Sequence, residues 1–279
     1  MGVRSEYIWF NGQLVPYEDA KVHVLTHTLH YGLGVFEGIR AYSQPDGSAG
    51  VWRLKEHLQR FLDSIRMCRM PTCPYSLDDL VAAVKETLRA NNMTEAYIRP
   101  LAFLGDGAMG LGARNNPLQV VIAVWEWGSY LGDDGVANGV RVKTSTLVRH
   151  HPNAALQRAK VVGHYVNNIL ARYEANDDGY DEAIMLDHQG HVAEGTGENL
   201  FIVEESGRVL TPSAVNILPG ITRQTIIDLC EIDGVTVVEQ LFGRDALYVA
   251  REIFMVGTAA EVTPIQSVDR LPVTQSPGP

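Results

Sequence analysis

The sequence is poor in cysteine. Its three cysteines, Cys68, Cys73 and Cys230, are too few for a disulfide framework in a chain of 279 residues. Four residues separate Cys68 from Cys73, whereas a redox-active pair has two residues between its cysteines. We therefore expect a reducing, cytoplasmic location.

Long runs of one chemical character are also missing. No apolar run approaches the ~20 residues that span a bilayer, and the first six residues lack the apolar core of a secretory signal. No run of Lys or Arg forms a basic patch, and the net charge is −10. We therefore expect neither a membrane nor a nucleic acid as a partner.

The chain does have enough apolar residues for a large core. Its hydrophobic content of 46% over 279 residues predicts two domains. Residues 7–10 and 13–15 predict a β-hairpin, because Asn11-Gly12 between them supplies the positive φ angles of a type I′ turn.

Helices and strands follow in the first half of the chain. Apolar residues at helical spacing predict a helix over 54–69. A second helix is expected to begin at Ser76, with Asp79 as the partner in a capping box. Residues 96–104 and 119–127 are rich in β-branched and aromatic side chains, which predicts two strands.

Turn-forming residues interrupt the pattern at 128–135. We therefore expect a linker at 128–136 between a small domain of residues 1–127 and a large domain of residues 137–279. The large domain is expected to contain strands near 140–147, 182–187, 199–204, 208–211, 235–239 and 252–257, and helices near 163–176, 221–231 and 243–250. Hairpins mixed with a few helices predict an α+β fold, not a doubly wound parallel sheet.

Lys160 is the first candidate for a chemical role. It lies in an apolar stretch with Ala159, Val161 and Val162, and burying an ammonium is costly unless it is paired or neutral. A lysine whose pKa is lowered by burial becomes a nucleophilic amine that can form a Schiff base. Alone, one lysine among valines is weak evidence for that role.

Three further features, taken with Lys160, predict a site for pyridoxal phosphate. Glu194 lies in a Gly-rich turn, where its carboxylate could keep a pyridine nitrogen protonated. Gly220 precedes an apolar helix whose first N–H groups form an anion site, to which Thr222 adds a hydroxyl. Tyr165 could donate to the phenolate oxygen of the cofactor. Each has an ordinary alternative: a solvated loop glutamate, a Pro-Gly turn before a helix, or a tyrosine that fills the core.

Two other sequence patterns could indicate a ligand site, one for a dinucleotide and one for a metal ion. Residues 105–110 match G-x-G-x-x-G, but residues 111–117 cannot begin a helix, so a flexible loop is favoured over a dinucleotide site. His23, His27 and His30 would share one face of a helix as metal ligands, but the residues around His23 resemble a strand. We therefore expect hydrogen-bonded histidines and no metal site.

Five motifs, in the same order along the chain, resemble the fold-type IV pyridoxal-phosphate enzymes, and most closely the bacterial branched-chain aminotransferases. The motifs are Tyr31–Arg40, Tyr97–Pro100, Glu194–Asn199, Leu218–Arg223 and Gly257–Glu261. The resemblance extends from about Tyr7 to about Asp269 and implies a two-domain α+β fold. Family members continue into a further C-terminal helix, so we expect this sequence either to be truncated or to lack one covering element.

The resemblance also implies roles for individual residues. Lys160 would carry pyridoxal phosphate and shuttle a proton, Tyr165 would contact the phenolate oxygen, and Glu194 would contact the ring nitrogen. The phosphate would be held by Arg60, Ile221, Thr222 and Thr258, with Leu218 packed against the ring. The substrate would be bound by Thr258, Ala259 and Tyr97 at its α-carboxylate, by Arg99 at a γ-carboxylate, and by Tyr31, Phe36, Gly38, Trp127 and Tyr130 around its side chain.

The implied reaction is transamination of the branched-chain L-amino acids leucine, isoleucine and valine with 2-oxoglutarate, which yields 2-oxo acids and L-glutamate. An apolar pocket with Arg99 at its edge would accept both leucine and glutamate. The family also implies a homodimer or a higher homo-oligomer, whose active sites are completed across the interface by residues 105–112 and by the segment around Tyr31.

Three alternatives stay open. A D-amino-acid or (R)-amine transaminase has the same fold, although Tyr31–Arg40 and Tyr97–Pro100 favour the branched-chain activity. An aminodeoxychorismate lyase shares the cofactor, but the aromatic motifs and Arg99 argue against it. A non-catalytic cofactor-binding or interaction protein would have no use for the full set of catalytic groups.

Overall fold

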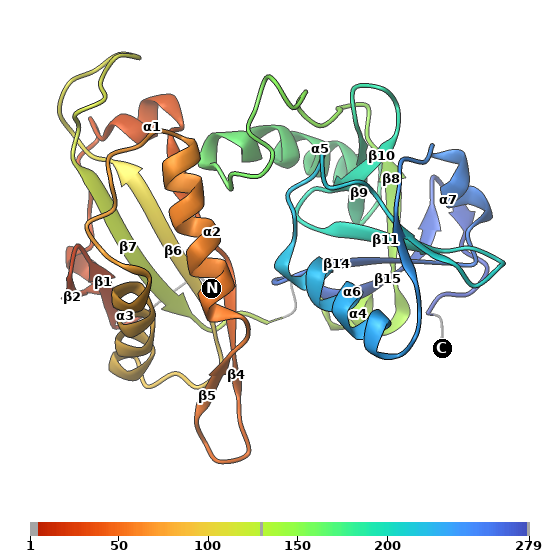
Figure 1. Cartoon of the computed structure of the whole chain (residues 1–279), viewed down its shortest axis with the longest axis horizontal. Coiled ribbons are helices and arrows are strands. Elements are labelled where there is room, and N and C mark those ends of the chain that lie inside the picture. The colour runs from red at the N-terminus through yellow and green to blue at the C-terminus, as the bar shows by residue number, and fades with distance from the viewer. Residues whose placement is uncertain (1–4, 129–130, 278–279) are drawn as a thin grey trace. The chain divides into compact units, whose positions relative to one another are not determined.

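The computed structural model describes residues 5–128 and 131–277. The chain forms two compact units (Figure 1). Unit 1 consists of Met1–Trp127 and Ala159–His164, and unit 2 consists of Gly128–Arg158 and Tyr165–Pro279. The segment with Lys160, expected in the large domain, is therefore grouped with unit 1. Part of the expected irregular linker at 128–136 is helical, since α4 (Asp133–Asn138) begins within it.

Unit 1 contains an antiparallel sheet of seven strands in its described part, in the order β2-β1-β7-β6-β4-β5, with β3 paired to β6. Its strands are β1 (Tyr7–Phe10), β2 (Gln13–Pro16), β3 (Gly34–Phe36), β4 (Ile39–Ser43), β5 (Ala49–Val51), β6 (Ala96–Leu104) and β7 (Leu118–Trp125). Its helices are α1 (His27–Tyr31), α2 (Leu54–Met67) and α3 (Leu77–Ala90), with short 3₁₀ turns at Tyr17–Asp19 and Val162–His164.

The local signals of unit 1 predicted its first hairpin and the beginning of helix α3, whereas α1, β3, β4 and β5 were not predicted. Asn11 and Gly12 have φ angles of 49° and 93°, and they join β1 to β2 in the expected hairpin. Ser76 caps α3, because its hydroxyl accepts from the Asp79 N–H while the Asp79 carboxylate accepts from the Ser76 N–H. Both predictions are confirmed.

The two central strands β6 and β7 present different side chains on their two faces, since alternate residues of a strand point in opposite directions. One face packs with α2 and α3 in the hydrophobic core of unit 1. This core includes Ile98, Ala102, Val120, Ile122 and Val124 of the sheet with Leu58, Phe61, Leu80 and Val84 of the helices. Tyr97, Arg99 and Trp125 alternate with these core residues and therefore lie on the opposite face.

Unit 2 contains a mixed sheet of nine strands in its described part, in the order β10-β9-β8-β15-β14-β11-β12-β13, with β16 paired to β15. Its strands are β8 (Val140–Thr144), β9 (Glu182–Leu186), β10 (Val192–Gly195), β11 (Asn199–Val203), β12 (Val209–Thr211), β13 (Val237–Glu239), β14 (Glu252–Gly257), β15 (Glu261–Val268) and β16 (Leu271–Pro272). Besides α4, its helices are α5 (Tyr165–Asp177), α6 (Ile221–Ile232) and α7 (Asp245–Val249). Hairpins and helices together make the expected α+β fold.

Two helices pack on this sheet in different ways. The small residues Ala171 and Ala175 of α5 pack on Ala183 and Met185 of β9. Helix α6 uses larger side chains, which contact Phe201 and its neighbours on β11, β12 and β14. The sheet therefore packs against α5 through small side chains and against α6 through larger ones.

Candidate active site

Lys160 is held through its backbone by two elements of unit 1. Its N–H donates to Ser64 Oγ of α2 at 3.2 Å, and its carbonyl accepts from the Phe36 N–H of β3 at 3.0 Å. The next residue, Val161, forms a β-bridge with Val35. The Lys160 Nζ lies 5.1 Å from the centre of the Phe36 ring. The half-buried amine is therefore fixed beside the face of an aromatic ring.

Arg60, expected at a phosphate, is oriented by a buried carboxylate. Its Nε and Nη2 donate to the two oxygens of Glu37 at 2.6 and 2.9 Å, and His57 Nδ1 lies 2.8 Å from Glu37 Oε2. Burial alone would raise the pKa of Glu37, but the Arg60 charge and the hydrogen bonds from His57 and Arg60 hold it well below its usual range. Glu37 is therefore an anion that fixes the direction of the Arg60 guanidinium.

His57 completes this arrangement as a neutral donor. Burial lowers its pKa, against the opposing effect of the Glu37 hydrogen bond. A neutral imidazole beside the ionised Glu37 carries its proton on Nδ1. Neither Glu37 nor His57 was predicted from the sequence as a site residue. Glu37 lies inside the Tyr31–Arg40 motif, and His57 precedes Arg60 by three positions on α2, so both were near recognised signals.

Arg99 lies among aromatic rings on the face of the unit 1 sheet opposite α2 and α3. Its guanidinium carbon is 4.7 Å from the centre of the Phe36 ring, 5.3 Å from Tyr97 and 5.6 Å from Trp125. Tyr97 also packs against Trp127, with 4.5 Å between ring centres. Phe36, Tyr97, Arg99 and Trp127 are thus brought together, while Trp125 was not among the predicted pocket residues. Trp125 lies directly opposite Tyr97 across the β6–β7 pair, and this register is what would have indicated it as a pocket residue.

Gly38 stands next to this cluster, and its lack of a side chain has a clear reason. A Cβ built at Gly38 would lie 1.9 Å from the Tyr97 hydroxyl oxygen. The Tyr97 hydroxyl therefore occupies the space that any other residue at position 38 would need.

Glu194 lies in unit 2 and is buried in a network of donors. Arg149 Nη2 is 2.8 Å from its Oε1, and Asn199 Nδ2 and the Leu218 N–H donate to its Oε2 at 3.0 and 3.2 Å. The strand β10 that carries Glu194 has an irregular register against β9 between Val192 and Glu194. Glu194 was predicted from the sequence as a site residue, whereas Arg149 and the contact of Asn199 with Glu194 were not.

The predicted phosphate and carboxylate groups of unit 2 lie near Glu194. Ile221 and Thr222 begin α6, whose N-cap residue Gly220 provides no side chain to cap the first N–H groups. Leu218 precedes this helix and donates to Glu194. Thr258 and Ala259 follow β14 directly, in the turn to β15.

The beginning of β11 and the end of β14 lie side by side, since Asn199 pairs with Val256. Because Asn199 also contacts both Glu194 and Leu218, the Thr258 turn belongs to the same end of the sheet. Unit 2 thus brings Glu194, Leu218, the beginning of α6 and the turn with Thr258 and Ala259 to the same end of its sheet.

The predicted residues are divided between the two units. Arg60 and Lys160 belong to unit 1, together with the substrate-pocket residues Tyr31, Phe36, Gly38, Tyr97, Arg99 and Trp127. Tyr165, Glu194, Leu218, Ile221, Thr222, Thr258 and Ala259 belong to unit 2. Tyr31 lies on α1 with 42% of its surface exposed, and its ring centre is 4.6 Å from that of His27. Tyr130 lies outside the described residues.

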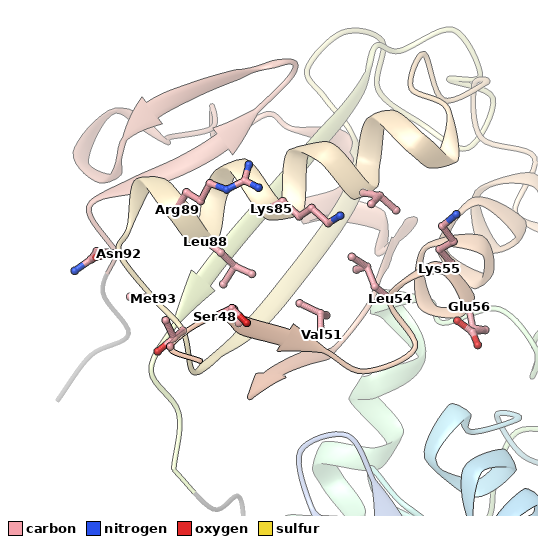
Figure 2. A pocket seen from close by; sticks show the side chains of 14 residues that line it. Ser48, Val51, Leu54, Lys55, Glu56, Lys85, Leu88, Arg89, Asn92 and Met93 are labelled. Atoms are coloured by element: carbon pink, nitrogen blue, oxygen red, sulfur yellow. The ribbon is translucent and has the colours of Figure 1, made fainter. Parts of the chain in front are cut away.

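Unit 1 also has a groove of about 740 Å³ at another place. Figure 2 shows it between β5, the first turn of α2 and helix α3, with Val51, Leu54 and Leu88 on its wall and Lys55, Lys85 and Arg89 at its rim. None of the predicted site residues lines this groove. We therefore do not assign the proposed chemistry to it.

The two other sequence patterns have structural explanations. Residues 105–117 form the loop between β6 and β7, as expected. His27 and His30 lie on the short helix α1, and their Nε2 atoms are 3.0 and 2.9 Å from the backbone carbonyls of Gly110 and Val24. No strand forms around His23, so that expectation was wrong.

No group of three His, Cys, Asp or Glu side chains in the described part of the chain could hold a metal ion. Among the described helices, none combines the length and the apolarity that crossing a membrane requires.

Comparison with known families identifies the chain. The family model for amino-transferase class IV matches residues 34–268. This chain belongs to the class IV aminotransferases. The match, which begins within the first motif, spans the other four and confirms the resemblance to fold-type IV branched-chain aminotransferases, together with the α+β fold.

This class IV aminotransferase is similar to curated branched-chain-amino-acid aminotransferases. It is 48% identical to the one from Pseudomonas aeruginosa over 269 residues, which cover 96% of this chain and 87% of that relative. It is 45% identical to the one from Escherichia coli strain K12 over 271 residues, which cover 97% of this chain and 87% of that relative.

Solved structures of the same class are also similar to this aminotransferase. The crystal structure of the Escherichia coli branched-chain amino acid aminotransferase has a TM-score of 0.94 at 45% identity, and the alignment covers 98% of this chain and 90% of that one. The branched-chain amino acid aminotransferase from Thermobaculum terrenum, crystallised in its PLP-form, has a TM-score of 0.91 at 34% identity, with 100% of this chain and 91% of that one covered.

Proposed function

We propose that this protein transfers the amino group of leucine, isoleucine or valine to 2-oxoglutarate, giving branched-chain 2-oxo acids and L-glutamate. The observation that carries the proposal is the Arg99 guanidinium among aromatic rings, in a chain whose relatives are named branched-chain-amino-acid aminotransferases. Aromatic rings suit an aliphatic side chain, whereas a guanidinium suits the γ-carboxylate of the second substrate.

The groups of this chain fit pyridoxal phosphate as the cofactor. When bound, this cofactor withdraws electrons from the bonds at the substrate α-carbon. Lys160 supplies a primary amine, and Glu194 supplies a carboxylate already paired with a cation. The first N–H groups of α6 have no side-chain cap and stand beside the Thr222 hydroxyl, as a phosphate site requires.

Each of these residues has a distinct task in the proposal. The Lys160 Nζ would hold the cofactor covalently, and the same amine would accept the proton from the substrate α-carbon. The Glu194 carboxylate keeps the proton on the ring nitrogen, and the Tyr165 hydroxyl donates to the phenolate oxygen. We assign the phosphate to Arg60, Ile221, Thr222 and Thr258, as the family resemblance implies, and Leu218 to the face of the ring.

The proposed substrate pocket follows the same division of tasks. Tyr97 and the backbone of Thr258 and Ala259 receive the α-carboxylate. Arg99 pairs with the γ-carboxylate of glutamate or 2-oxoglutarate, since a guanidinium can bind a carboxylate through two parallel hydrogen bonds. The apolar side chain is surrounded by Tyr31, Phe36, Gly38, Trp127 and Tyr130.

We also propose that the protein is cytoplasmic and acts as a homodimer or a higher homo-oligomer, with active sites completed across the interface. The resemblance in the Tyr31 segment and in residues 105–112 supports the oligomer. The three unpaired cysteines support a reducing compartment.

The decisive experiment uses the purified protein reconstituted with pyridoxal phosphate. We expect a visible absorbance band that disappears on addition of L-leucine and returns with 2-oxoglutarate. Borohydride should attach the cofactor to Lys160 in the native protein but not in Lys160→Ala. Normal turnover by that variant would refute the proposal. A response to D-alanine or an (R)-amine without one to L-leucine would favour the related transaminases instead, and release of pyruvate from aminodeoxychorismate would favour the lyase.

A further inference from the structure

Arg149 makes three side-chain contacts that join three separate segments of unit 2. Its Nη2 lies 2.8 Å from Glu194 Oε1 of β10 and 2.8 Å from Gln157 Oε1, and its Nη1 lies 2.8 Å from Asn168 Oδ1 of α5. Only 5% of its surface is exposed, and its own N–H donates to the Leu186 carbonyl at 2.8 Å. A buried guanidinium with this geometry is fixed in direction by its acceptors.

We propose that Arg149 is a positioning residue of the transamination reaction, which keeps the Glu194 carboxylate ionised and oriented and braces the segment that leads to Lys160. The proposal rests on the proposed function, because it assigns Glu194 to the ring nitrogen of pyridoxal phosphate. Arg149 itself does not contact the reacting atoms in this proposal.

Glu194 is buried, with 5% of its surface exposed. Asn199 and the Leu218 N–H are neutral donors to this carboxylate, whereas Arg149 brings a positive charge. A buried carboxylate without a cation is strongly disfavoured and takes up a proton. A protonated Glu194 would lose the negative charge that stabilises a protonated ring nitrogen, so loss of Arg149 should weaken cofactor binding.

The contacts of Arg149 with Gln157 and Asn168 connect Glu194 to two neighbouring segments of the chain. Gln157 stands three residues before Lys160, and its Nε2 donates to the His150 carbonyl at 2.6 Å, which closes the segment between them. Asn168 Nδ2 donates to the Thr196 carbonyl at 2.5 Å, in the turn that follows Glu194. One side chain therefore ties the carboxylate both to its own turn and to the residues before the catalytic amine.

The experiment measures the affinity of the apo-protein for pyridoxal phosphate by absorbance titration between about pH 6 and pH 9. For Arg149→Met we expect at least a tenfold weaker affinity at neutral pH, and a loss that shrinks as the pH rises and Glu194 ionises without help. Arg149→Lys keeps the charge but loses the fork, so it should bind less tightly than the native protein while keeping the native pH profile.

Other titratable groups on the surrounding segments do not confuse the reading, because every variant retains them. They include His150, His151, Arg158, Tyr165, Arg172, Tyr173, Glu174, Glu182, Asp187, His191 and Glu198. Arg223→Met is the matched control, since Arg223 is also buried in unit 2 and contacts Thr211, Pro212 and Glu239. Arg223→Met should lower the thermal midpoint of unfolding. It should not introduce the pH-dependent loss of cofactor affinity that is expected for Arg149→Met.

Glu194→Gln separates failure of this inference from failure of the proposed function. If Glu194→Gln binds the cofactor as the native protein does, the role of Glu194 and with it the proposed function are wrong. If Glu194→Gln weakens binding but Arg149→Met leaves affinity and pH profile unchanged, only the inference is overturned. If Arg149→Met does not fold, Arg149→Lys tests the inference. A cofactor affinity equal to that of the native protein would then show that the directed contacts of the guanidinium are not needed. Adding Arg149→Met to Glu194→Gln should cause little further loss if the two act together.

Discussion

At Gly38, the backbone comes so close to another side chain that one methyl group does not fit. The Tyr97 hydroxyl oxygen is 1.9 Å from the position of a Cβ. Gly38→Ala must therefore displace Tyr97, and we expect kcat/KM for leucine to fall by at least tenfold while cofactor binding is kept. In a Tyr97→Phe background the same change should cost less, because the obstructing oxygen is gone. Equal losses in both backgrounds would contradict this explanation.

Arg99 should discriminate between the two substrates. Arg99→Leu removes the charge but keeps an apolar side chain among the rings. We expect kcat/KM for glutamate to fall on the order of 100-fold, about 3 kcal/mol, since a charge-assisted pair is lost. The leucine half-reaction of the same variant is the internal control and should change by less than tenfold. A uniform loss for both substrates would show that Arg99 only supports the fold.

Some site residues could be predicted from the sequence, and others could not. Glu194 and Thr222 lie in short motifs and Lys160 lies in a short apolar stretch, so nearby residues were enough to make all three candidates, although none was decisive alone. Arg149 has acceptors at positions 157, 168 and 194, and no local spacing reveals contacts that depend on the fold of a whole unit. The partnership of Arg60 with Glu37 was hidden for the same reason, because β3 and α2 come together only in the folded chain.

Helix α3 depends on its capping box. Ser76→Ala removes the acceptor of the Asp79 N–H, and we expect the free energy of unfolding to fall by about 1 kcal/mol. Calorimetry would show this as a lower thermal midpoint. Ser76→Asp restores an acceptor and should recover most of the loss. A midpoint that stays the same in Ser76→Ala would mean that packing alone holds the first turn.

The Glu174 carboxylate of helix α5 contacts β8 and the segment after it, and its contribution to stability should depend on pH. Glu174 accepts from Lys143 Nζ at 2.9 Å and from Ser145 Oγ at 2.5 Å. Burial alone would raise the pKa of Glu174, but the hydrogen bonds from Ser145, Lys143 and Thr146 lower it to about 2. Because the folded-state pKa is depressed, the stabilisation is present above the ordinary value of 4.5 and is lost as the pH falls toward 2.

Glu174→Gln should therefore lower the thermal midpoint at neutral pH, by an amount that corresponds to about 1 kcal/mol. The difference from the native protein should shrink below pH 4.5 and vanish near pH 2. Thermal melts over that range would measure it. Glu231→Gln on the exposed side of α6 is the control, and a similar pH trend in that variant would rule out a specific effect of Glu174.

Elements with strong local signals were predicted, and elements defined by their neighbours were not. The residues of the hairpin at Asn11-Gly12 and of the capped helix α3 determine these elements locally. Strand β15 was missed because it contains Pro264 and alternates weakly, yet it pairs with both β14 and β8 in the middle of the sheet. Helix α4 was missed because turn-forming residues dominate its sequence. Tertiary pairing overrides propensity in β15.

At the scale of the whole molecule, the proposed homodimer should hide an apolar stripe on α5. Val166, Ile169, Leu170 and Tyr173 are 59%, 46%, 50% and 61% exposed and follow helical spacing along one face. Light scattering should give a mass of at least twice 30.7 kDa. Leu170→Glu should shift the protein toward the monomer, whereas Val249→Glu on α7 should not. A monomeric native protein would contradict the proposal.

The grouping of Ala159–His164 with unit 1 has a consequence for how this protein can be divided or recombined. The polypeptide enters unit 1 twice, so a gene fragment that stops at Trp127 encodes most of that unit but omits the amine. Such a fragment would also lose the Val161 strand partner and uncover Val35, which is fully buried in the intact chain. Exchange of either unit between homologues therefore needs three junctions, at about 127, 158 and 164, and a chimera with a single junction would join the lysine of one parent to the strand β3 of another.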